Sequence, residues 1–308
     1  MGDSEQTPPS YADQLWVISR ITAPAIAQAV EWAGLAEGSH GLDAGCGAGC
    51  HLEPLARAVG PPGRLTALDI SPENLARARE SWGSLTTGCR TGSRAGGAEP
   101  VIPTSGAPGG AVPTGGVPGG ARPAVDFALG DIRRLPFDDD TFDWVWCADT
   151  LWPGRIHSDP VAIVAEFGRV SRPGGKVCLL YWSGQTLLPG YPILEARLNA
   201  GFAEWAPYYS GTQAEAHHLR AQTWLRQAGL KQLQARTFLA EVRSPIDPAT
   251  REALAACYAM FWEELEGRVS AADRQAYERL CRPTSPDFIA DIPDYYAFMT
   301  YTLFSGVI

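Results

Sequence analysis

The sequence predicts an α/β fold, a doubly wound parallel sheet with helices on both faces. Stretches with strand character alternate with stretches of helical periodicity, and in GLDAGCGAGCHL the first predicted strand runs directly into a glycine-rich turn. Parallel strands need crossover connections, and the helices that form them cover both faces of the sheet. The 308 residues suffice for one large domain of this kind or for two small ones.

The N-terminal part supplies the first strand–helix repeats. A helix is predicted over 11–33, where apolar residues recur at helical spacing. Another helix, SPENLARARESW, has Ser71 in the capping position, Pro72 at the first helical position and Asn74 at the third. The remaining elements expected here are a strand at about 40–44, a helix at about 51–59, and the strand GRLTALDIS, which ends at Asp69.

The alternation resumes after residue 124 and becomes looser towards the C-terminus. Three strands are expected, AVDFALGDI, TFDWVWCADTLW and KVCLLYWS, and before the last of them comes the helix DPVAIVAEFGRVSRPGG, closed by a Pro-Gly-Gly turn. The helix AEAHHLRAQTWLRQAGL and the strand KQLQARTFLAEV follow. Residues 249–281 are expected to be helical, and 293–308 hold the final strand, YYAFMTYTLFSGVI.

Two segments, 184–214 and 246–292, lie outside this alternation. In a doubly wound fold, ligands bind beyond the carboxyl ends of the strands. Both segments are therefore expected to be helical lid insertions over that crevice.

Residues 84–124 differ in composition from the rest of the chain. They are rich in Gly, Pro, Ala and Thr, contain PGGA twice, and have almost no large apolar side chains. Such a segment cannot bury enough surface to offset the entropy of ordering, so a disordered surface insertion is expected. Residues 1–308 are then one domain, with N-terminal helices within 1–35 and the insertion inside the core.

Charge and composition narrow the possible partners. The net charge is −9 and no Lys/Arg cluster occurs, which argues against nucleic acid and against an anionic membrane surface. The seven cysteines are mostly in apolar contexts, as expected for reduced thiols of a cytoplasmic protein. Neither a signal peptide nor a membrane-spanning run is expected, because the N-terminus is polar and no apolar run is long enough.

Several kinds of site compete for the glycine turn. A phosphate loop is excluded because no Lys follows Gly49. The dinucleotide pattern Gly-x-Gly-x-x-Gly is missed because the third glycine comes one residue early and Cys50 takes its place. Cys46 and Cys50 have no third cysteine nearby, so no metal site is expected. A tight bend without a ligand stays open at this point.

Further motifs, taken in order, point to a family. The pattern Asp-x-Gly-x-Gly-x-Gly at 43–49 is followed by an acid, Asp69, at the end of the next strand. LGDIRRLPFDDDTFDWV and EFGRVSRPGGKV come next. Together these motifs resemble the class I S-adenosylmethionine-dependent methyltransferases, and the nearest group is that of the ubiquinone/menaquinone-type enzymes. The resemblance covers roughly 36–83 and 124–183.

The resemblance implies a Rossmann-like, seven-stranded sheet that is mostly parallel, with an antiparallel final strand. It makes 36–183 the cofactor-binding core and S-adenosylmethionine the methyl donor. The glycines would let the backbone approach the donor, Asp43 would help to hold its positively charged end, Asp69 would take both ribose hydroxyls, and Asp131 would accept from the adenine amine. Each acid has the alternative of an ordinary strand-end or turn carboxylate. The donor-binding residues implied are Asp43, Gly45, Cys46, Gly47, Gly49, Asp69, Ile70, Gly130, Asp131, Ile132 and Cys147.

The acceptor site has no signature of its own. His157 follows the fourth strand and is a candidate general base, with a surface histidine as the alternative. Asp149 is a second catalytic candidate, with a turn or helix cap as its alternative. Trp152, Tyr191 and Tyr295 are candidates to bind a flat acceptor, or a cationic amine through cation–π contact, unless they are simply core residues.

The function expected is methyl transfer to a small-molecule acceptor by in-line displacement, which depends mainly on positioning. A non-catalytic module that binds S-adenosylmethionine is the alternative from another class. An NAD-dependent oxidoreductase is disfavoured by the early third glycine and by the RPGG turn. The acceptor, the attacked atom and the oligomeric state remain open.

Overall fold

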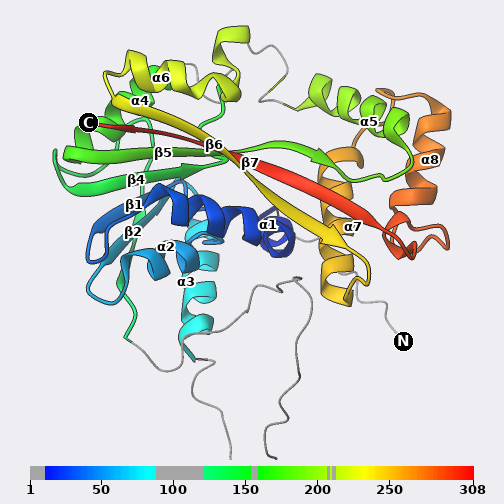
Figure 1. Cartoon of the computed structure of the whole chain (residues 1–308), viewed down its shortest axis with the longest axis horizontal. Helices are drawn as coiled ribbons and strands as arrows, with labels where there is room; N and C mark the ends of the chain where they lie inside the picture. Colours follow the sequence, from blue (N-terminus) through cyan, green and yellow to red (C-terminus); the bar gives the residue numbers. More distant parts are fainter. Residues whose placement is uncertain (1–10, 88–120, 154–158, 207–208, 210–212) are drawn as a thin grey trace, which may run out of the picture.

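A seven-stranded sheet in the order β3-β2-β1-β4-β5-β7-β6 runs through the molecule (Figure 1). The computed structural model describes residues 11–87, 121–153, 159–206, 209 and 213–308. The strands are β1 (His40–Ala44), β2 (Arg64–Asp69), β3 (Ala124–Leu129), β4 (Phe142–Ala148), β5 (Ser171–Thr186), β6 (Lys231–Arg243) and β7 (Tyr296–Val307). The first five pair in parallel, and β7 pairs antiparallel with both β5 and β6. The mostly parallel sheet with an antiparallel final strand is confirmed.

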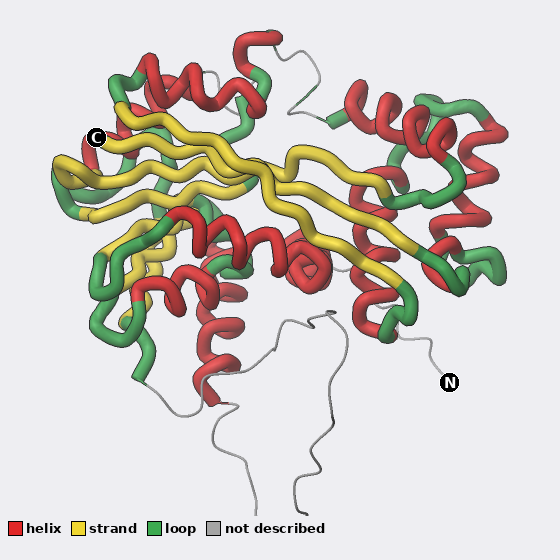
Figure 2. The backbone as a smooth tube through the Cα atoms, in the orientation of Figure 1, coloured by secondary structure: helices red, strands yellow, loops and turns green. Residues whose placement is uncertain are grey.

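Helices cover both faces of the sheet (Figure 2). One face carries α1 (Tyr11–Ala33), α2 (Leu52–Val59) and α3 (Pro72–Thr87), and the other carries α4 (Pro160–Val170) and α6 (Ala221–Gln227). A second group of helices gathers at the far end of the long strands β5–β7. This group comprises α5 (Pro192–Trp205), α7 (Pro248–Trp262) and α8 (Ala271–Cys281). None of the helices in the described part of the chain is both long and apolar enough to span a membrane.

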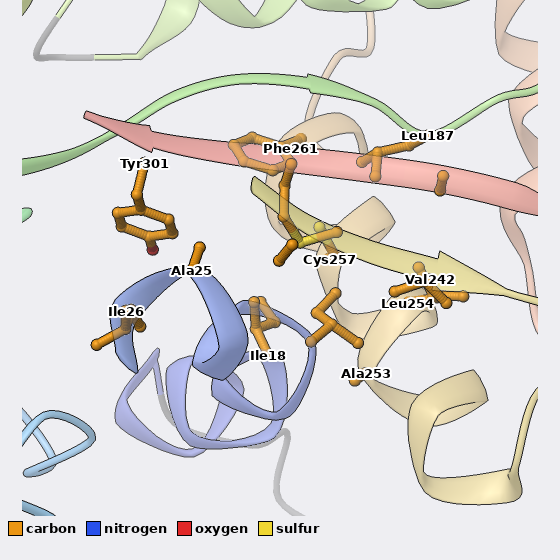
Figure 3. Packing of buried hydrophobic residues seen from close by; sticks show 14 of the residues in the cluster. Ile18, Ala25, Ile26, Leu187, Val242, Ala253, Leu254, Cys257, Phe261 and Tyr301 are labelled. Atoms are coloured by element: carbon orange, nitrogen blue, oxygen red, sulfur yellow. The ribbon is translucent and has the colours of Figure 1, made fainter. Parts of the chain in front are cut away.

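The core divides between the two faces of the sheet. One large cluster joins α1 and α2 to the strands and to α5, α7 and α8, and another joins α4 and α6 to the opposite face. In Figure 3, α1 directs Ile18 and Ala25 towards Tyr301 of β7 and Cys257 of α7, two elements with which α1 packs extensively. Burial of a side chain such as Ile18 contributes roughly 1.5–3 kcal/mol. Helix α1 is therefore held firmly along the edge of the site described below.

Side-chain caps mark the starts of two helices, and the cap at Ser71 is the one that the sequence predicts. Asn74 donates its N–H to the Ser71 hydroxyl oxygen at 3.2 Å, so Ser71 caps α3. The Asp159 carboxylate likewise accepts from the N–H of Ala162 at 2.9 Å at the start of α4. These caps fix where α3 and α4 begin, and with them the loops at the carboxyl ends of the preceding strands.

Some boundaries differ from expectation. Helix α3 continues to Thr87 and β3 already includes Ala124, so the ends of the predicted insertion 84–124 are regular structure, and 88–120 lie outside the described residues. The predicted Pro-Gly-Gly turn lies within β5, because Ser171 pairs with Phe142 and the register shifts before Lys176.

The helical predictions of the last third also need correction. The helix expected to end at Gly229 begins with two short 3₁₀ helices, Ala214–Ala216 and His218–Arg220, before α6. The region 249–281 is broken between Trp262 and Ala271 into α7 and α8. A third short 3₁₀ helix, Ile289–Asp291, precedes β7.

Candidate functional site

A cavity of about 830 Å³ lies at the carboxyl ends of β1, β2 and β4, where a doubly wound fold places its ligands. This volume is in the range of small-molecule sites. Residues from α1, the glycine turn, the ends of β2–β4, β5, α5, α7 and β7 line it. Both predicted lid segments contribute side chains, among them Gln185, Asn199 and Phe202 from 184–214 and Phe261 from 246–292.

Nine of the eleven residues implied as donor-binding line this cavity. They are Asp43, Gly45, Cys46, Gly47, Asp69, Ile70, Gly130, Asp131 and Ile132. They come from three separate strand ends, which the sheet order β3-β2-β1 places next to one another.

The glycine turn is folded back onto β2. The N–H groups of Gly45 and Cys46 both donate to the carbonyl oxygen of Leu68, at 2.7 and 2.9 Å. Gly45 has a φ of +82°, and a Cβ there would lie 2.2 Å from the side chain of Thr150. Gly47 also has a positive φ, +52°, but a Cβ there would meet no atom within 4 Å. Gly45 is thus required for close packing against Thr150 in the loop after β4, whereas Gly47 borders open space.

The Asp69 carboxylate links the end of β2 to the glycine turn. Its Oδ2 accepts from the N–H of Gly47 at 2.9 Å, and its Oδ1 accepts from the N–H of Ser71 at 2.8 Å and from Asn74 Nδ2 at 3.2 Å. These hydrogen bonds use three of about four acceptor positions of a carboxylate. One position on Oδ2 is left on a side chain that lines the cavity.

Asp43 at the end of β1 is a buried acid with an unsatisfied oxygen. The residue is 1% exposed, and its Oδ2 has no hydrogen-bond partner. Burial, and then the negative charge of Asp69, raise the pKa of Asp43 to about 7. An orphaned carboxylate oxygen is costly to bury, so this position favours a ligand that carries positive charge or hydrogen-bond donors.

Beyond β3 the cavity is bordered by a short loop. The Asp131 carboxylate is held by the side chain of Arg133, with Nε at 3.0 and 2.8 Å from the two oxygens and Nη2 at 2.5 Å from Oδ2. Ile70, just after β2, is 64% exposed and offers an apolar wall to the same part of the cavity. A ligand that hydrogen-bonds to Asp131 must therefore share it with Arg133.

Asp149 directly follows β4, in the loop that contacts the glycine turn. It is one of the few non-glycine residues with positive φ, 45°. Its Oδ1 accepts from the N–H of Trp182 at 2.9 Å, and its carboxylate also accepts from the hydroxyl of Tyr301. Burial raises the pKa of Asp149 to about 6. The next residue, Thr150, donates its hydroxyl to the carbonyl oxygen of Gly45 at 3.0 Å, which ties this loop to the glycine turn.

Aromatic side chains line the part of the cavity next to Asp149. The ring of Trp182 lies 5.2 Å from that of Phe261 and 5.6 Å from that of Tyr301, measured between centroids. Trp152, a predicted substrate-binding residue, also lines the cavity and donates its indole N–H to the Asp149 carbonyl oxygen at 2.6 Å.

Two of the implied donor-binding residues lie away from the cavity. Gly49 faces α2 and α3, where a Cβ would come within 3.0–3.2 Å of Leu52 and Ala78, so this glycine serves helix packing. The Cys147 side chain is 1% exposed and belongs to the core on the α4 face. Successive side chains of a strand point to opposite faces, and it is the next residue, Ala148, that lines the cavity.

The two predicted substrate-binding tyrosines also lie outside the cavity lining. Tyr191 is the N-cap residue of α5 and is 36% exposed, outside the cavity lining. Tyr295 is fully buried, with its hydroxyl 3.0 Å from the carbonyl oxygen of Leu187 and 2.7 Å from the hydroxyl of Tyr258. It is a hydrogen-bonded core residue. The predicted base, His157, lies outside the described residues.

Several cavity residues were not predicted from the sequence. Leu15, Ser19 and Thr22 of α1 line it, together with Asn199 of α5 and Tyr301 of β7. The spacing of four and three residues along α1 places the first three on one helix face, a signal that was available. For Asn199 and Tyr301 the chain offers no local signal, because their position depends on how α5 and β7 pack.

Comparison with known proteins agrees with this geometry. Two family models, each described as a methyltransferase domain, match residues 42–95 and 115–179. A demethylmenaquinone methyltransferase of Staphylococcus aureus (strain JH9) is 28% identical over 195 residues, which are 63% of this chain and 62% of that protein. An uncharacterized 37.1 kDa protein in transposon TN4556 of Streptomyces fradiae is 32% identical over 158 residues, 51% of this chain and 34% of that protein. The chain thus spans between about a third and three fifths of these relatives.

Solved structures share the fold. A protein of Anaeromyxobacter dehalogenans, described as a candidate type II methyltransferase, superposes with a TM-score of 0.51 at 17% identity, over 91% of this chain and 95% of that one. A candidate methyltransferase from Bacillus halodurans gives 0.50 at 16% identity, over 92% and 97%. The two matched methyltransferase-domain models, the curated relative and the shared fold thus make this chain similar to class I S-adenosylmethionine-dependent methyltransferases, the family that the sequence motifs resemble.

Proposed function

We propose that this protein transfers the methyl group of S-adenosylmethionine to a small-molecule acceptor inside the cavity. The observation that carries the proposal is one continuous cavity with two unlike parts. The glycine turn and the carboxylates of Asp43 and Asp69 line one part, and Trp182, Phe261 and Tyr301 line the other. The first part suits a cationic, hydroxyl-bearing donor, and the second leaves room for an acceptor beside it.

Asp43 would hold the positively charged end of the donor. The donor bears a sulfonium and an ammonium group, and either supplies what the unsatisfied Oδ2 of Asp43 lacks. Ionisation of Asp43 is held back by burial and by Asp69, so a bound cation would also favour its charged form.

The ribose and adenine would lie towards β2 and β3. Asp69 has an acceptor position left on Oδ2, and a second ribose hydroxyl would have to replace the weaker hydrogen bond from Asn74 Nδ2. Ile70 would offer its apolar side chain to the flat adenine ring. Asp131 would accept from the adenine amine while keeping part of its contact with Arg133.

Methyl transfer from a sulfonium depends more on positioning of the acceptor than on a strong acid or base. S-adenosylmethionine, when bound, supplies a methyl group on a sulfonium that leaves as a neutral thioether. The chain would hold the acceptor in line with the carbon–sulfur bond, and such positioning is worth several kcal/mol of the barrier. Residues from α1, α5 and α7, such as Ile18, Phe202 and Phe261, line the site and would exclude water from it.

Two observations support a small acceptor. Side chains of α5 and α7 line the cavity around Trp182 and Tyr301, which restricts the size of what can reach the methyl group. The Staphylococcus aureus relative is, by its name, a methyltransferase of demethylmenaquinone, a small molecule.

The test is formation of S-adenosylhomocysteine from S-adenosylmethionine in the presence of pooled small acceptors. The proposal predicts product that depends on both the protein and a pool, and that is lost in a Gly45→Ala variant. Donor binding without product from any pool would favour the alternative, a non-catalytic module that binds S-adenosylmethionine.

A further inference from the structure

Among the residues that the structure describes, the carboxylate of Asp149 has no cationic partner. It accepts from two neutral donors, the N–H of Trp182 at 2.9 Å and the hydroxyl of Tyr301. Within the described ranges, no Lys, Arg or His forms an ion pair with it. Carboxylates removed from water are normally paired with a positive charge. A cationic ligand in the cavity would supply the missing partner.

The side chains next to Asp149 also suit a cation. The rings of Trp182, Phe261 and Tyr301 line the cavity together, with centroid distances of 5.2 and 5.6 Å from Trp182 to the other two. An aromatic face attracts a cation within about 6 Å, most strongly where water is excluded. The hydroxyl of Tyr301 is directed to the Asp149 carboxylate, so the rings and the carboxylate belong to one cluster.

The charged residues that line the cavity also favour a cationic ligand. Four carboxylates line it: those of Asp43, Asp69, Asp131 and Asp149. Arg133 is the one Lys or Arg among the lining residues that the structure describes, and it is already paired with Asp131. His51 also lines the cavity, but burial lowers its pKa to about 4, so it is neutral near pH 7. An anionic acceptor would be repelled here, whereas the cavity can hold a second cation beside the donor.

We propose, building on the function proposed above, that the acceptor is an amine that enters as its ammonium ion and binds between Asp149 and the rings of Trp182, Phe261 and Tyr301. The hydrogen bond from Thr150 to the Gly45 carbonyl keeps this cluster next to the turn that would hold the donor. Amine and methyl group would therefore be neighbours.

Asp149 takes one proton from the ammonium ion and frees the nitrogen lone pair. That lone pair forms the new carbon–nitrogen bond with the methyl carbon, while the electrons of the carbon–sulfur bond stay on sulfur. The positive charge of the sulfonium ends on the methylated ammonium product, and Asp149 later releases its proton to water.

A pair of matched probes tests the binding step without any turnover. The protein is saturated with S-adenosylhomocysteine and titrated with choline and with its uncharged carbon analogue, in which a tert-butyl group replaces the trimethylammonium group. The two have nearly the same shape, so their difference reports charge recognition. We expect choline to bind about tenfold more tightly or better. Equal affinities, preference for the uncharged analogue, or no binding of either would overturn the proposal.

Variants locate the preference in the cluster. Asn tolerates positive φ and can still accept from Trp182 and Tyr301, so Asp149→Asn keeps the fold and removes the charge. We expect Asp149→Asn to abolish the preference for choline and Phe261→Leu to weaken it. Asp126→Asn, which removes a surface partner of Arg64, is the matched control and should change neither. An unchanged preference in Asp149→Asn would overturn the proposal.

Turnover distinguishes this inference from the proposed function. With acceptor pools sorted by class, amines should yield S-adenosylhomocysteine, and Asp149→Asn should lower that rate by about a hundredfold or more while donor binding changes less than about threefold. Turnover of phenols, thiols or carboxylic acids but not amines would overturn the inference and leave the proposed function standing. Failure to bind the donor would instead remove the proposed function.

Discussion

Asp69 Oδ2 accepts a hydrogen bond from the N–H of Gly47 at 2.9 Å, so the acid at the end of β2 holds the turn that follows β1. These residues lie 22 positions apart, and each lines the same cavity. The carboxylate thus has a structural task besides the ribose contact proposed for it.

Replacing Asp69 should therefore harm both the turn and donor binding. Asp69→Ala leaves the N–H groups of Gly47 and Ser71 without their acceptor, and we expect a loss of about 1–3 kcal/mol in unfolding free energy. Donor binding, measured by calorimetry, should weaken about tenfold or more. Asp126→Ala on the neighbouring strand should cost less than about 1 kcal/mol, because its ion pair with Arg64 is exposed. Donor affinity unchanged in Asp69→Ala would remove this acid from the donor site.

The two glycines at the start of the turn should respond very differently to alanine. In Gly45→Ala the new methyl would lie 2.2 Å from Thr150, so the turn and the loop after β4 must separate and donor binding should be lost. Gly47→Ala meets no neighbour and should cost only the strain of positive φ, about 1 kcal/mol. Thermal melts and donor titrations of the pair check this. Equal effects of the two substitutions would contradict the tight contact between Gly45 and Thr150.

The pKa of Asp43 predicts how stability and donor binding depend on pH. Its folded-state pKa is raised to about 7, above its ordinary value, so the folded protein holds this proton more tightly than the unfolded chain. Its contribution to stability is therefore favourable at low pH and is lost as pH rises through about 7, by an amount on the order of 4 kcal/mol. The difference in melting temperature between Asp43→Asn and wild type should be positive near pH 8 and shrink towards pH 5. Other titrating groups, including Asp149, contribute equally to the melting temperatures of variant and wild type, so the difference between the two removes their effect.

Donor binding should show the opposite trend, because it needs the charged form of Asp43. Affinity for S-adenosylmethionine should rise about tenfold between about pH 6 and pH 8 in the wild type, since about a tenth of Asp43 is ionised at the lower value. Asp43→Asn should bind weakly at both. A wild-type affinity that does not change over this range would show that Asp43 does not pair with the donor.

Tyr295 and Tyr301 should separate core packing from acceptor binding. Tyr295→Phe removes a hydroxyl held by Leu187 and Tyr258, and should lower the unfolding free energy by about 1–2 kcal/mol without changing acceptor KM. Tyr301→Phe removes a donor to Asp149 at the cavity, and should lower kcat/KM for the acceptor. A change of acceptor KM in Tyr295→Phe would mean that the acceptor site extends beyond the cavity, as far as the start of the final strand.

Much of the fold and of the donor end of the site could be predicted because the signals there are local. Ser71 caps α3 and Asp69 ends β2, as their neighbours in the sequence indicate. Gly49 and Cys147 do not line the cavity, because Gly49 packs against α2 and α3 and the Cys147 side chain points into the core on the α4 face.

The residues that line the acceptor end of the cavity were much harder to predict from the sequence. Tyr295 lies directly before β7 and Tyr301 lies within it, yet the first is buried against Leu187 and Tyr258 and the second lines the cavity. That difference is set by how α5 and α7 pack over β7, through contacts between residues far apart in the chain. No local pattern in YYAFMTYTLF contains this information.

The most direct test of the account is calorimetric titration of the purified protein with S-adenosylmethionine and, separately, with S-adenosylhomocysteine, in wild type and in Gly45→Ala. The account predicts that the wild type binds both at micromolar concentrations and that the variant binds neither. A folded wild-type protein that binds neither compound, or a Gly45→Ala variant that binds both as well as wild type, would contradict it.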